Sequence, residues 1–411
     1  MKFIKNEANT TPIVDTVFSI VSLATEAIKV NGADKVVNAT IGSLFNEEGK
    51  LVALDSVFNH FNEIDNITKA KYAGSFTGNA SYRKQVFEWV KGNADLKLEH
   101  SVIATPGGTG AVSMTIGNIL DPGETLVIPE IAWGSYNLMA SDNQLDVVKY
   151  SLFKEDKFNM DSFKETCLNV LKKQNKLLVI INDPCHNPTG YSMTKEEWTE
   201  VIEFINECGK TAPSVILNDI AYIDYSYNLN NTRKYMETFN NISDNVLIVV
   251  AFSTSKSLTS YGLRCGAAVI LAKDKQTVRD VEIVFEKVAR ATWSNITNVA
   301  MDNFTYVTTT GIEAYMSEKN YYVNLLKERS DIFIKEAKEA NLECYPYKEG
   351  FFVTVNIQDN DLRDKYHSLL MDNLIFSVKV NKGIRVAICS LSVDKCKGLA
   401  PRMKQILDTI K

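Results

Sequence analysis

Residues 245–264 read Asn-Val-Leu-Ile-Val-Val-Ala-Phe-Ser-Thr-Ser-Lys-Ser-Leu-Thr-Ser-Tyr-Gly-Leu-Arg, an apolar run that passes directly into a serine-rich loop. The run 245–252 is short and rich in Val and Ile, which predicts a buried strand. Lys256 follows this strand closely. A lysine held near apolar or cationic groups loses its proton and becomes a nucleophile. Taken alone, Lys256 is explained more simply as a solvated loop lysine.

Similar short apolar runs occur on both sides of this stretch, and most of them alternate with polar, helix-like segments. They are Ser101–Ala104, Thr125–Ile128, Lys176–Asn182, Ser214–Asp219 and Arg264–Leu271. Such a rhythm predicts an α/β fold, in which a central, mostly parallel sheet is flanked by helices on both faces. Ligand sites in sheets of this kind lie at the carboxyl ends of the strands.

The two terminal regions of the chain have a different sequence pattern from its centre. Asp15–Val30 has apolar residues at helical spacing, and Gly311–Asn341 reads as one long charged helix followed by a shorter α+β stretch. We therefore expect a large domain over residues 51–310. A smaller domain would combine residues 1–50 with residues 311–411.

Composition excludes several classes of protein. The 411 residues are 45% hydrophobic and 23% charged, which is typical of a globular protein. Lys and Arg number 45 against 50 Asp and Glu, a net charge of −5 that gives no basic footprint for nucleic acid. No apolar run approaches the ~20 residues of a membrane helix.

The seven cysteines form no C-x-x-C pair, and the first residues do not read as a secretory signal, so we expect reduced thiols in the cytoplasm. The four histidines have no paired spacing for a metal site.

Polar residues follow three further strands. Thr105–Ala111 is a Gly-rich turn leading into a helix, whose free N–H groups could cradle a phosphate or simply form a turn. Asn182–Gly190 contains Asn-Pro and Thr-Gly, which are also turn residues. Asp219 ends a buried strand and precedes Tyr222, and an isolated acid at this place is often a helix N-cap. Four such segments in order along one sheet favour a shared site.

Together these segments resemble the fold-type I, pyridoxal-phosphate-dependent aminotransferases, and most of all the aspartate and aromatic amino-acid aminotransferase group. The resemblance rests on H-N-P-T-G at 186–190, on D-x-A-Y at 219–222 and on S-x-S-K at 253–256 with an arginine eight residues after the lysine, in this order along the chain. It extends from Val37–Gly42 to Gly383–Ala387, nearly the whole chain.

The resemblance implies a role for each matching residue. Lys256 would hold pyridoxal 5′-phosphate as a Schiff base and shuttle the proton at the substrate Cα, while Asp219 would keep the pyridine nitrogen protonated. Tyr222 and Asn187 would bond the 3′-oxygen of the ring, and Trp133 would stack on the ring. The phosphate would be bound by Gly108, Thr109, Ser253, Ser255, Arg264 and, from the neighbouring subunit, Tyr72.

The resemblance also implies the substrates and the assembly. Arg385 would grip the substrate α-carboxylate bidentately, with Gly42, Asn187 and Phe352 beside it. Arg290, lent by the partner subunit, would bind the distal carboxylate of glutamate or aspartate. The protein would thus be a homodimer with shared active sites. It would move the amino group of an acidic or aromatic L-amino acid to a 2-oxo acid such as 2-oxoglutarate in a ping-pong cycle.

Three departures from the family pattern affect the details. Gly107 stands where many relatives have a serine, Ile296-Thr297 replaces the prolines that often follow Ser-Asn, and Trp133 lies four residues after Pro129 rather than two. Tyr136, Trp293 and Phe352 are candidates for an aromatic wall of the pocket. Two alternatives remain at this point. One is a pyridoxal-phosphate-dependent β-lyase, and the other is a non-catalytic, cofactor-binding regulatory protein.

Overall fold

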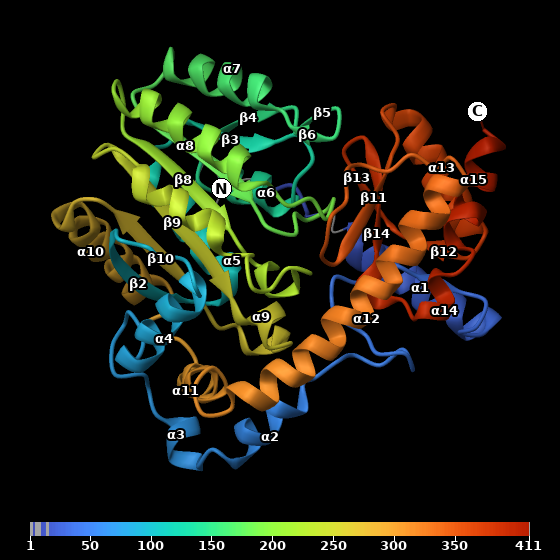
Figure 1. The fold of residues 1–411 in the computed structure, drawn as a ribbon, viewed down its shortest axis with the longest axis horizontal. Coiled ribbons are helices and arrows are strands. Elements are labelled where there is room, and N and C mark those ends of the chain that lie inside the picture. Colours follow the sequence, from blue (N-terminus) through green and yellow to red (C-terminus); the bar gives the residue numbers. More distant parts are fainter. Residues whose placement is uncertain (1–2, 5–9, 14–15, 411) are drawn as a thin grey trace.

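The computed structural model describes residues 3–4, 10–13 and 16–410 of the chain. Within these residues the central element is a seven-stranded sheet of order β2-β10-β9-β8-β7-β3-β4. Its strands are β2 (Glu99–Thr105), β3 (Thr125–Pro129), β4 (Asp146–Tyr150), β7 (Leu177–Asn182), β8 (Ser214–Asp219), β9 (Val246–Ser253) and β10 (Gly266–Ala272). Strand β10 is antiparallel to β2 and β9, whereas β9, β8, β7, β3 and β4 run parallel to one another. The predicted, mostly parallel sheet is confirmed (Figure 1).

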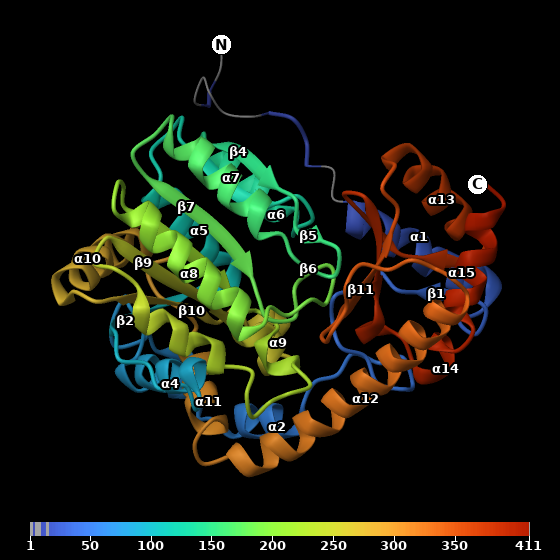
Figure 2. The ribbon, with the colours of Figure 1, turned by 45° about the horizontal axis from the view of Figure 1, so that its top comes forward.

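Both faces of this sheet are covered by helices. Along β9, Val246, Ile248 and Val250 belong to one buried cluster. The alternate residues Leu247 and Val249 belong to another. Because successive side chains point to opposite faces, a strand buried on both sides reads as a continuous apolar run. Helices α7 (Met160–Leu171) and α8 (Lys195–Gly209) pack on the first face, and α5 (Gly107–Ile119), α6 (Ser135–Asp142) and α10 (Lys275–Thr292) pack on the second. Figure 2 shows α8 in front of the sheet and α5 behind it.

The sequence analysis missed strand β4 and placed the start of β10 two residues too early. Strand β4 lies at the sheet edge and pairs only with β3 among the described strands, and Asp146 and Lys149 on it are exposed. Its pattern therefore lacks the apolar run of the central strands. Arg264 adopts a left-handed conformation with φ of 49° after the turn Tyr261–Leu263, so that the ladder begins at Gly266.

The N-terminal and C-terminal elements pack together beside the large sheet (Figure 1). Strand β1 (Val37–Asn38) pairs with β12 (Ile375–Phe376), and β11 (Phe352–Asn356), β14 (Gly383–Ala387) and β13 (Val378–Val380) form an antiparallel sheet. The helices of this part are α1 (Thr16–Asn31), α13 (Asn360–Asp372), α14 (Val393–Cys396) and α15 (Leu399–Asp408). The first residue of the helix expected over Asp15–Val30 lies outside the described residues. The domain boundaries near residues 50 and 311 stay a prediction.

One long helix, α12 (Ile312–Glu339), runs along both parts of the molecule (Figures 1 and 2). It agrees closely with the helix expected over Gly311–Asn341. The remaining elements lie around the large sheet or close short loops: α2 (Asp55–Glu63), α3 (Asn66–Ala70), α4 (Ala80–Lys91), α9 (Thr254–Ser257), α11 (Asn298–Val307), β5 (Phe153–Lys154) and β6 (Lys157–Phe158). Among the helices of the described residues, none has the length and apolar character that a membrane span requires.

Candidate active site

A cavity of about 340 Å³ opens at the carboxyl ends of β7, β8 and β9. Most of the site residues expected from the sequence line it. They are Gly108, Thr109, Trp133, Asn187, Asp219, Tyr222, Ser253, Ser255, Lys256 and Arg264. The parallel topology accounts for this convergence, because residues that follow neighbouring parallel strands meet at one edge of the sheet.

Lys256 lies on the single-turn helix α9, immediately after β9. The Ser253 side chain caps this turn, accepting a hydrogen bond from the Ser255 amide at 3.2 Å. The Lys256 ammonium donates to the carbonyl oxygen of Gly42 at 2.5 Å and lies 4.6 Å from the centroid of the Tyr261 ring. Burial lowers the pKa of Lys256 to about 8, and the charge of Arg385 acts in the same direction. A sizeable fraction of the amine is therefore neutral and nucleophilic near pH 8.

Asp219 ends β8 and is almost fully buried. Its Oδ2 accepts a hydrogen bond from the Tyr136 hydroxyl at 2.7 Å, and its Oδ1 accepts one from the Ala221 amide at 3.1 Å. Burial raises the pKa of Asp219, and these two hydrogen bonds act against that rise. The short helix that follows, Ile223–Tyr225, is preceded by Tyr222 and has no side-chain cap. Asp219 is thus no helix N-cap, and its carboxyl group faces the cavity.

An anion cradle forms where α5 begins. The amides of Gly108 and Thr109 lie in the first turn of this 13-residue helix, where N–H groups are free and the helix dipole favours negative charge. Opposite them, Arg264 Nη1 donates to Ser255 Oγ and to the carbonyl oxygen of Tyr261, both at 2.9 Å. Backbone amides, hydroxyls and a guanidinium around one space are the donors that a phosphate requires.

The structure shows why residue 107 is a glycine, where many members of the family have a serine. Its φ is +69°, and a Cβ atom there would lie 2.5 Å from Arg264 Nη2. A side chain at residue 107 would therefore strain the backbone and displace the guanidinium. The departure from the family pattern is coupled to the placement of Arg264.

Arg385, Phe352 and Gly42 are not among the lining residues of this cavity, but Arg385, on β14, contacts Asn187, which is one of them. Its guanidinium stacks on the Phe352 ring, 4.4 Å from the centroid, and Nη2 donates to the carbonyl oxygen of Thr40 at 3.0 Å. Nη1 donates to Asn187 Oδ1 at 3.3 Å. The buried Nε has no hydrogen-bond partner among the described residues. Such an orphaned donor beside a cavity fits a carboxylate ligand, since buried polar groups are normally paired.

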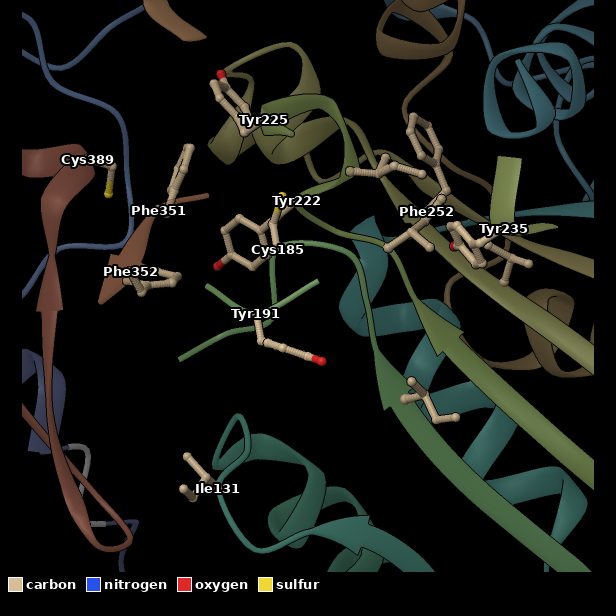
Figure 3. Packing of buried hydrophobic residues seen from close by; sticks show 14 of the residues in the cluster. Ile131, Cys185, Tyr191, Tyr222, Tyr225, Tyr235, Phe252, Phe351, Phe352 and Cys389 are labelled. Atoms are coloured by element: carbon tan, nitrogen blue, oxygen red, sulfur yellow. The ribbon is translucent and has the colours of Figure 1, made fainter. Parts of the chain in front are cut away.

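Aromatic rings join the two sides of the site. Figure 3 shows Phe351 and Phe352 facing Tyr222, whose ring centroid is 5.3 Å from that of Phe351 and 5.5 Å from that of Phe352. A Cβ atom on Gly42 would lie 3.1 Å from the Phe352 ring, so residue 42 must be small for this packing. Burial raises the pKa of Tyr222, although the charge of Arg385 opposes the rise. Its hydroxyl is therefore neutral and can donate a hydrogen bond.

Tyr72 and Arg290 do not reach the cavity of their own chain. Tyr72 is 84% exposed. The exposed Arg290 donates from Nη1 to Ser294 Oγ at 2.6 Å and lies 4.5 Å from the centroid of the Phe76 ring. The two residues share one surface, because Asn295 Oδ1, near Arg290, accepts a hydrogen bond from the amide of Ala73 at 2.9 Å.

The sequence analysis missed several residues that line the cavity. These are Ser43, Asn182, Ala221 and Tyr261, and Tyr136 was considered only as part of an aromatic wall. Tyr261 follows Lys256 by five residues in the stretch first quoted, and its hydroxyl accepts a hydrogen bond from the Leu44 amide at 2.9 Å. Trp293 is not among the lining residues. Within the part of the chain that the structure describes, no group of three His, Cys, Asp or Glu side chains could hold a metal ion.

These residues fit pyridoxal 5′-phosphate. The cavity joins an anion cradle to a buried carboxylate and a partly neutral lysine, and Arg385 adds an unpaired donor. The phosphate, the pyridine nitrogen and the aldehyde of the cofactor each have a matching group. The carboxylate of an amino acid has one in Arg385.

Comparison with known proteins identifies the family of this chain. Residues 34–403 match the family model "Aminotransferase class I and II". The chain is similar to the mitochondrial aspartate aminotransferase of Schizosaccharomyces pombe, 25% identical over 290 residues, which cover 68% of this chain and 63% of that protein. An aromatic-amino-acid aminotransferase of Paracoccus denitrificans is 24% identical over 51% of this chain and 52% of its own length. The chain thus spans less than two-thirds of these curated relatives.

Solved structures resemble the chain over its full length. A crystal structure of an aminotransferase from Anaerococcus prevotii has 34% identity, covers 100% of both chains and superposes with a TM-score of 0.95. The aromatic-amino-acid aminotransferase of Burkholderia pseudomallei, solved covalently bound to pyridoxal phosphate, has 21% identity and a TM-score of 0.79, and covers 99% of this chain and 100% of that one. At that identity the second likeness concerns the fold alone.

Proposed function

This chain belongs to the aminotransferase class I and II family, and we propose that it is a pyridoxal 5′-phosphate-dependent aminotransferase that moves an amino group from an L-amino acid to a 2-oxo acid. One observation carries the proposal. Lys256 and Asp219 line one cavity that also contains an anion cradle, and Arg385 donates a hydrogen bond to Asn187 in the lining of the same cavity.

Different residues of the cavity are proposed to bind different parts of the cofactor. Lys256 Nζ would be the point of covalent attachment, and Asp219 would pair with the ring nitrogen. Tyr222 and Asn187 would hydrogen-bond the 3′-oxygen, and Trp133 would stack on the ring. Gly108, Thr109, Ser253, Ser255 and Arg264 would hold the phosphate. When bound, the cofactor supplies an electron-withdrawing ring that stabilises negative charge at the substrate Cα.

The chain's own groups then perform binding and proton transfer. Arg385 holds the α-carboxylate of the amino acid in a bidentate pair and so orients the Cα–H bond. Lys256 Nζ, whose pKa is lowered to about 8, would take the proton from the substrate Cα and hold it for the return transfer. Because the first product leaves before the 2-oxo acid binds, the kinetics are ping-pong. 2-Oxoglutarate is the proposed acceptor.

The substrate preference and the assembly depend on a second subunit. Tyr72 and Arg290 share an exposed surface of the chain and do not reach its own cavity, so we propose a homodimer in which each subunit lends both residues to its partner. Tyr72 completes the phosphate site, and Arg290 reads the distal carboxylate of glutamate or aspartate. Aromatic amino acids are the second proposed substrate class.

We place the enzyme in the cytoplasm. All seven cysteines are free thiols in the structure, and six of them are buried. A protein with this many reduced thiols is suited to a reducing compartment.

The visible absorption spectrum of the cofactor-loaded protein tests the function. Glutamate, aspartate and phenylalanine are added singly, without a 2-oxo acid, and the products are identified by mass spectrometry. Formation of pyridoxamine phosphate with one equivalent of the matching 2-oxo acid is the expected result. Release of ammonia and a 2-oxo acid with unchanged cofactor, from an added amino acid that carries a leaving group on Cβ such as S-methylcysteine, would identify a β-lyase. A loaded protein that transforms none of a full set of amino acids would identify a non-catalytic binding protein.

Borohydride reduction tests the attachment site. Reduction of the loaded protein followed by peptide mapping should place the phosphopyridoxyl group on Lys256. The matched variant Lys256→Ala should carry no label and show no turnover. A label on another lysine, or an active Lys256→Ala protein, would overturn the assignment.

A further inference from the structure

The Asp219 carboxylate is held by a buried tyrosine that is distant from it in the sequence. Tyr136, in α6, is 1% exposed, and its hydroxyl donates to Asp219 Oδ2 at 2.7 Å. The residues are 83 positions apart in the chain. The sequence makes Tyr136 a candidate for an aromatic wall of the pocket, whereas in the structure its hydroxyl group donates to the acid expected to pair with the cofactor ring.

The surroundings leave Tyr136 as the main polar partner of this acid. Asp219 makes no ion pair with any cation among the described residues, and its other oxygen accepts the Ala221 amide at 3.1 Å. Trp133 packs edge-on against Tyr136, with 5.4 Å between the ring centroids, which fixes the direction of the hydroxyl. A carboxylate has about four acceptor positions, so both oxygens keep a free lone pair toward the cavity.

We propose that Tyr136 is a positioning residue for the reaction, which orients the Asp219 carboxylate and keeps it ionised so that the proton stays on the cofactor's ring nitrogen. The inference rests on the proposed function, because that function places the ring nitrogen against Asp219. A donor to a carboxylate favours its ionised form over its protonated form. In a carboxylate–pyridinium pair it therefore disfavours transfer of the proton from nitrogen to oxygen.

The Tyr136 hydroxyl is a neutral donor, and its neutrality affects the pair formed by the Asp219 carboxylate and the protonated ring nitrogen. A cation beside Asp219 would also stabilise the carboxylate, but it would repel the positive charge of the protonated ring. The tyrosine hydroxyl stabilises the carboxylate without that repulsion. Burial raises the pKa of Tyr136 far above the neutral range, so the hydroxyl keeps its proton and acts only as a donor.

Tyr136→Phe tests the proposal, because it removes one oxygen and keeps the ring. Tyr366→Phe is the matched control, since Tyr366 is also fully buried and donates to a carbonyl oxygen, that of Met403, at 2.8 Å, far from the cavity. Each apo-protein is titrated with pyridoxal phosphate and with its 1-deaza analogue, in which carbon replaces the ring nitrogen. In addition, the ¹⁵N resonance of bound, ¹⁵N-labelled cofactor reports the protonation of the ring.

For Tyr136→Phe, we expect the Kd for pyridoxal phosphate to rise about tenfold, the size of one hydrogen bond to a charged group. The Kd for the deaza analogue should stay within about twofold of the wild-type value. In Tyr366→Phe, the Kd values for pyridoxal phosphate and for the deaza analogue should both stay within that range. The ¹⁵N resonance should move toward that of the unprotonated ring. Equal losses for both cofactors, or an unmoved resonance, would overturn the proposal.

A second substitution keeps the proposal testable even if the Tyr136→Phe protein does not fold. 3-Fluorotyrosine placed at residue 136 keeps the shape and strengthens the donor, so the ring should remain protonated and the affinity should not fall. A ¹⁵N resonance moved toward the unprotonated value would contradict the proposal. Wild-type protein that binds neither cofactor would overturn the proposed function itself. A protonated ring in wild type and in Tyr136→Phe alike would overturn only the role of Tyr136.

Discussion

Lys256 and Gly42 are 214 residues apart, yet the lysine ammonium donates to the glycine carbonyl at 2.5 Å. The contact holds the amine inside the cavity, between the end of β9 and the N-terminal segment that packs on the C-terminal strands. The amine is thereby kept away from bulk water, and burial is the main cause of its lowered pKa.

The pH dependence of Lys256 reactivity follows from this burial. Since the pKa of Lys256 is lowered to about 8, its acetylation by trace acetic anhydride in the apo-protein should rise with pH through about 8 and then level off. Lys154 is the internal control, because its pair with Asp161 at 2.6 Å raises its pKa. Its labelling should still increase where that of Lys256 is constant. Superimposable curves, measured by mass spectrometry, would contradict the buried environment of Lys256.

Gly107→Ser should weaken cofactor binding although it adds a potential phosphate donor. The new Cβ atom would lie 2.5 Å from Arg264 Nη2, so the guanidinium must move. We expect the Kd for pyridoxal phosphate to rise on the order of tenfold, as for loss of one charged hydrogen bond. Gly123→Ser is the control, since Gly123 also has a positive φ of +88° but nothing within 4 Å of its Cβ position. Unchanged affinity in Gly107→Ser would show that Arg264 does not bind the phosphate.

Arg290→Ala should reduce kcat/KM for glutamate and aspartate by about 10–100-fold and leave phenylalanine within about twofold, because it removes only the partner of the distal carboxylate. Arg279→Ala is the control on the same helix, where Arg279 is exposed and pairs with Glu282 at 2.7 Å. Unchanged glutamate kinetics in Arg290→Ala would remove this residue from the site.

Mixing two variants tests whether Arg290 acts across subunits. Lys256→Ala and Arg290→Ala protomers are co-refolded, so that a hybrid dimer contains one site with an intact Lys256 and the partner's intact Arg290. Glutamate activity should return above that of either parent if the arginine is lent. No recovery, with hybrid formation shown by native mass spectrometry, would place Arg290 in its own subunit's site or outside it.

Asp224→Asn should destabilise the protein by about 3–5 kcal/mol, because it leaves two buried cations without their anion. Asp224 pairs with Arg233 at 2.6 Å and lies 3.8 Å from Lys319, all three being buried. Burial alone would raise the pKa of Asp224, but these cations outweigh it and hold the pKa well below its usual range. The native pair therefore contributes at neutral pH and is lost only in strong acid.

Urea unfolding of the apo-protein at pH 7 measures this loss. Asp394→Asn serves as the control, since the exposed Asp394 pairs with Lys397 at 2.9 Å on the surface. Its unfolding free energy should change by less than about 1 kcal/mol. Equal effects of the two substitutions would show that the buried cluster contributes no more than a surface pair.

Much of the fold could be predicted because it depends on local pattern. Central strands such as β8 and β9 are buried on both faces and read as apolar runs, so their residues and parallel arrangement follow from the sequence. Lys256 and Asp219 stand directly after those strands, and their convergence follows from the topology. The edge strand β4 lacks such a run and was missed.

The sequence by itself determined which residues are candidates for the proposed chemistry, because strand pattern and residue type are local properties. Only the tertiary structure decided what each of them touches. The contact of Tyr136 with Asp219, that of Gly42 with Lys256 and the stacking of Arg385 on Phe352 join segments that no local pattern relates. The burial and hydrogen bonds that set the pKa of each group come from these contacts, and therefore exist only once the chain has folded.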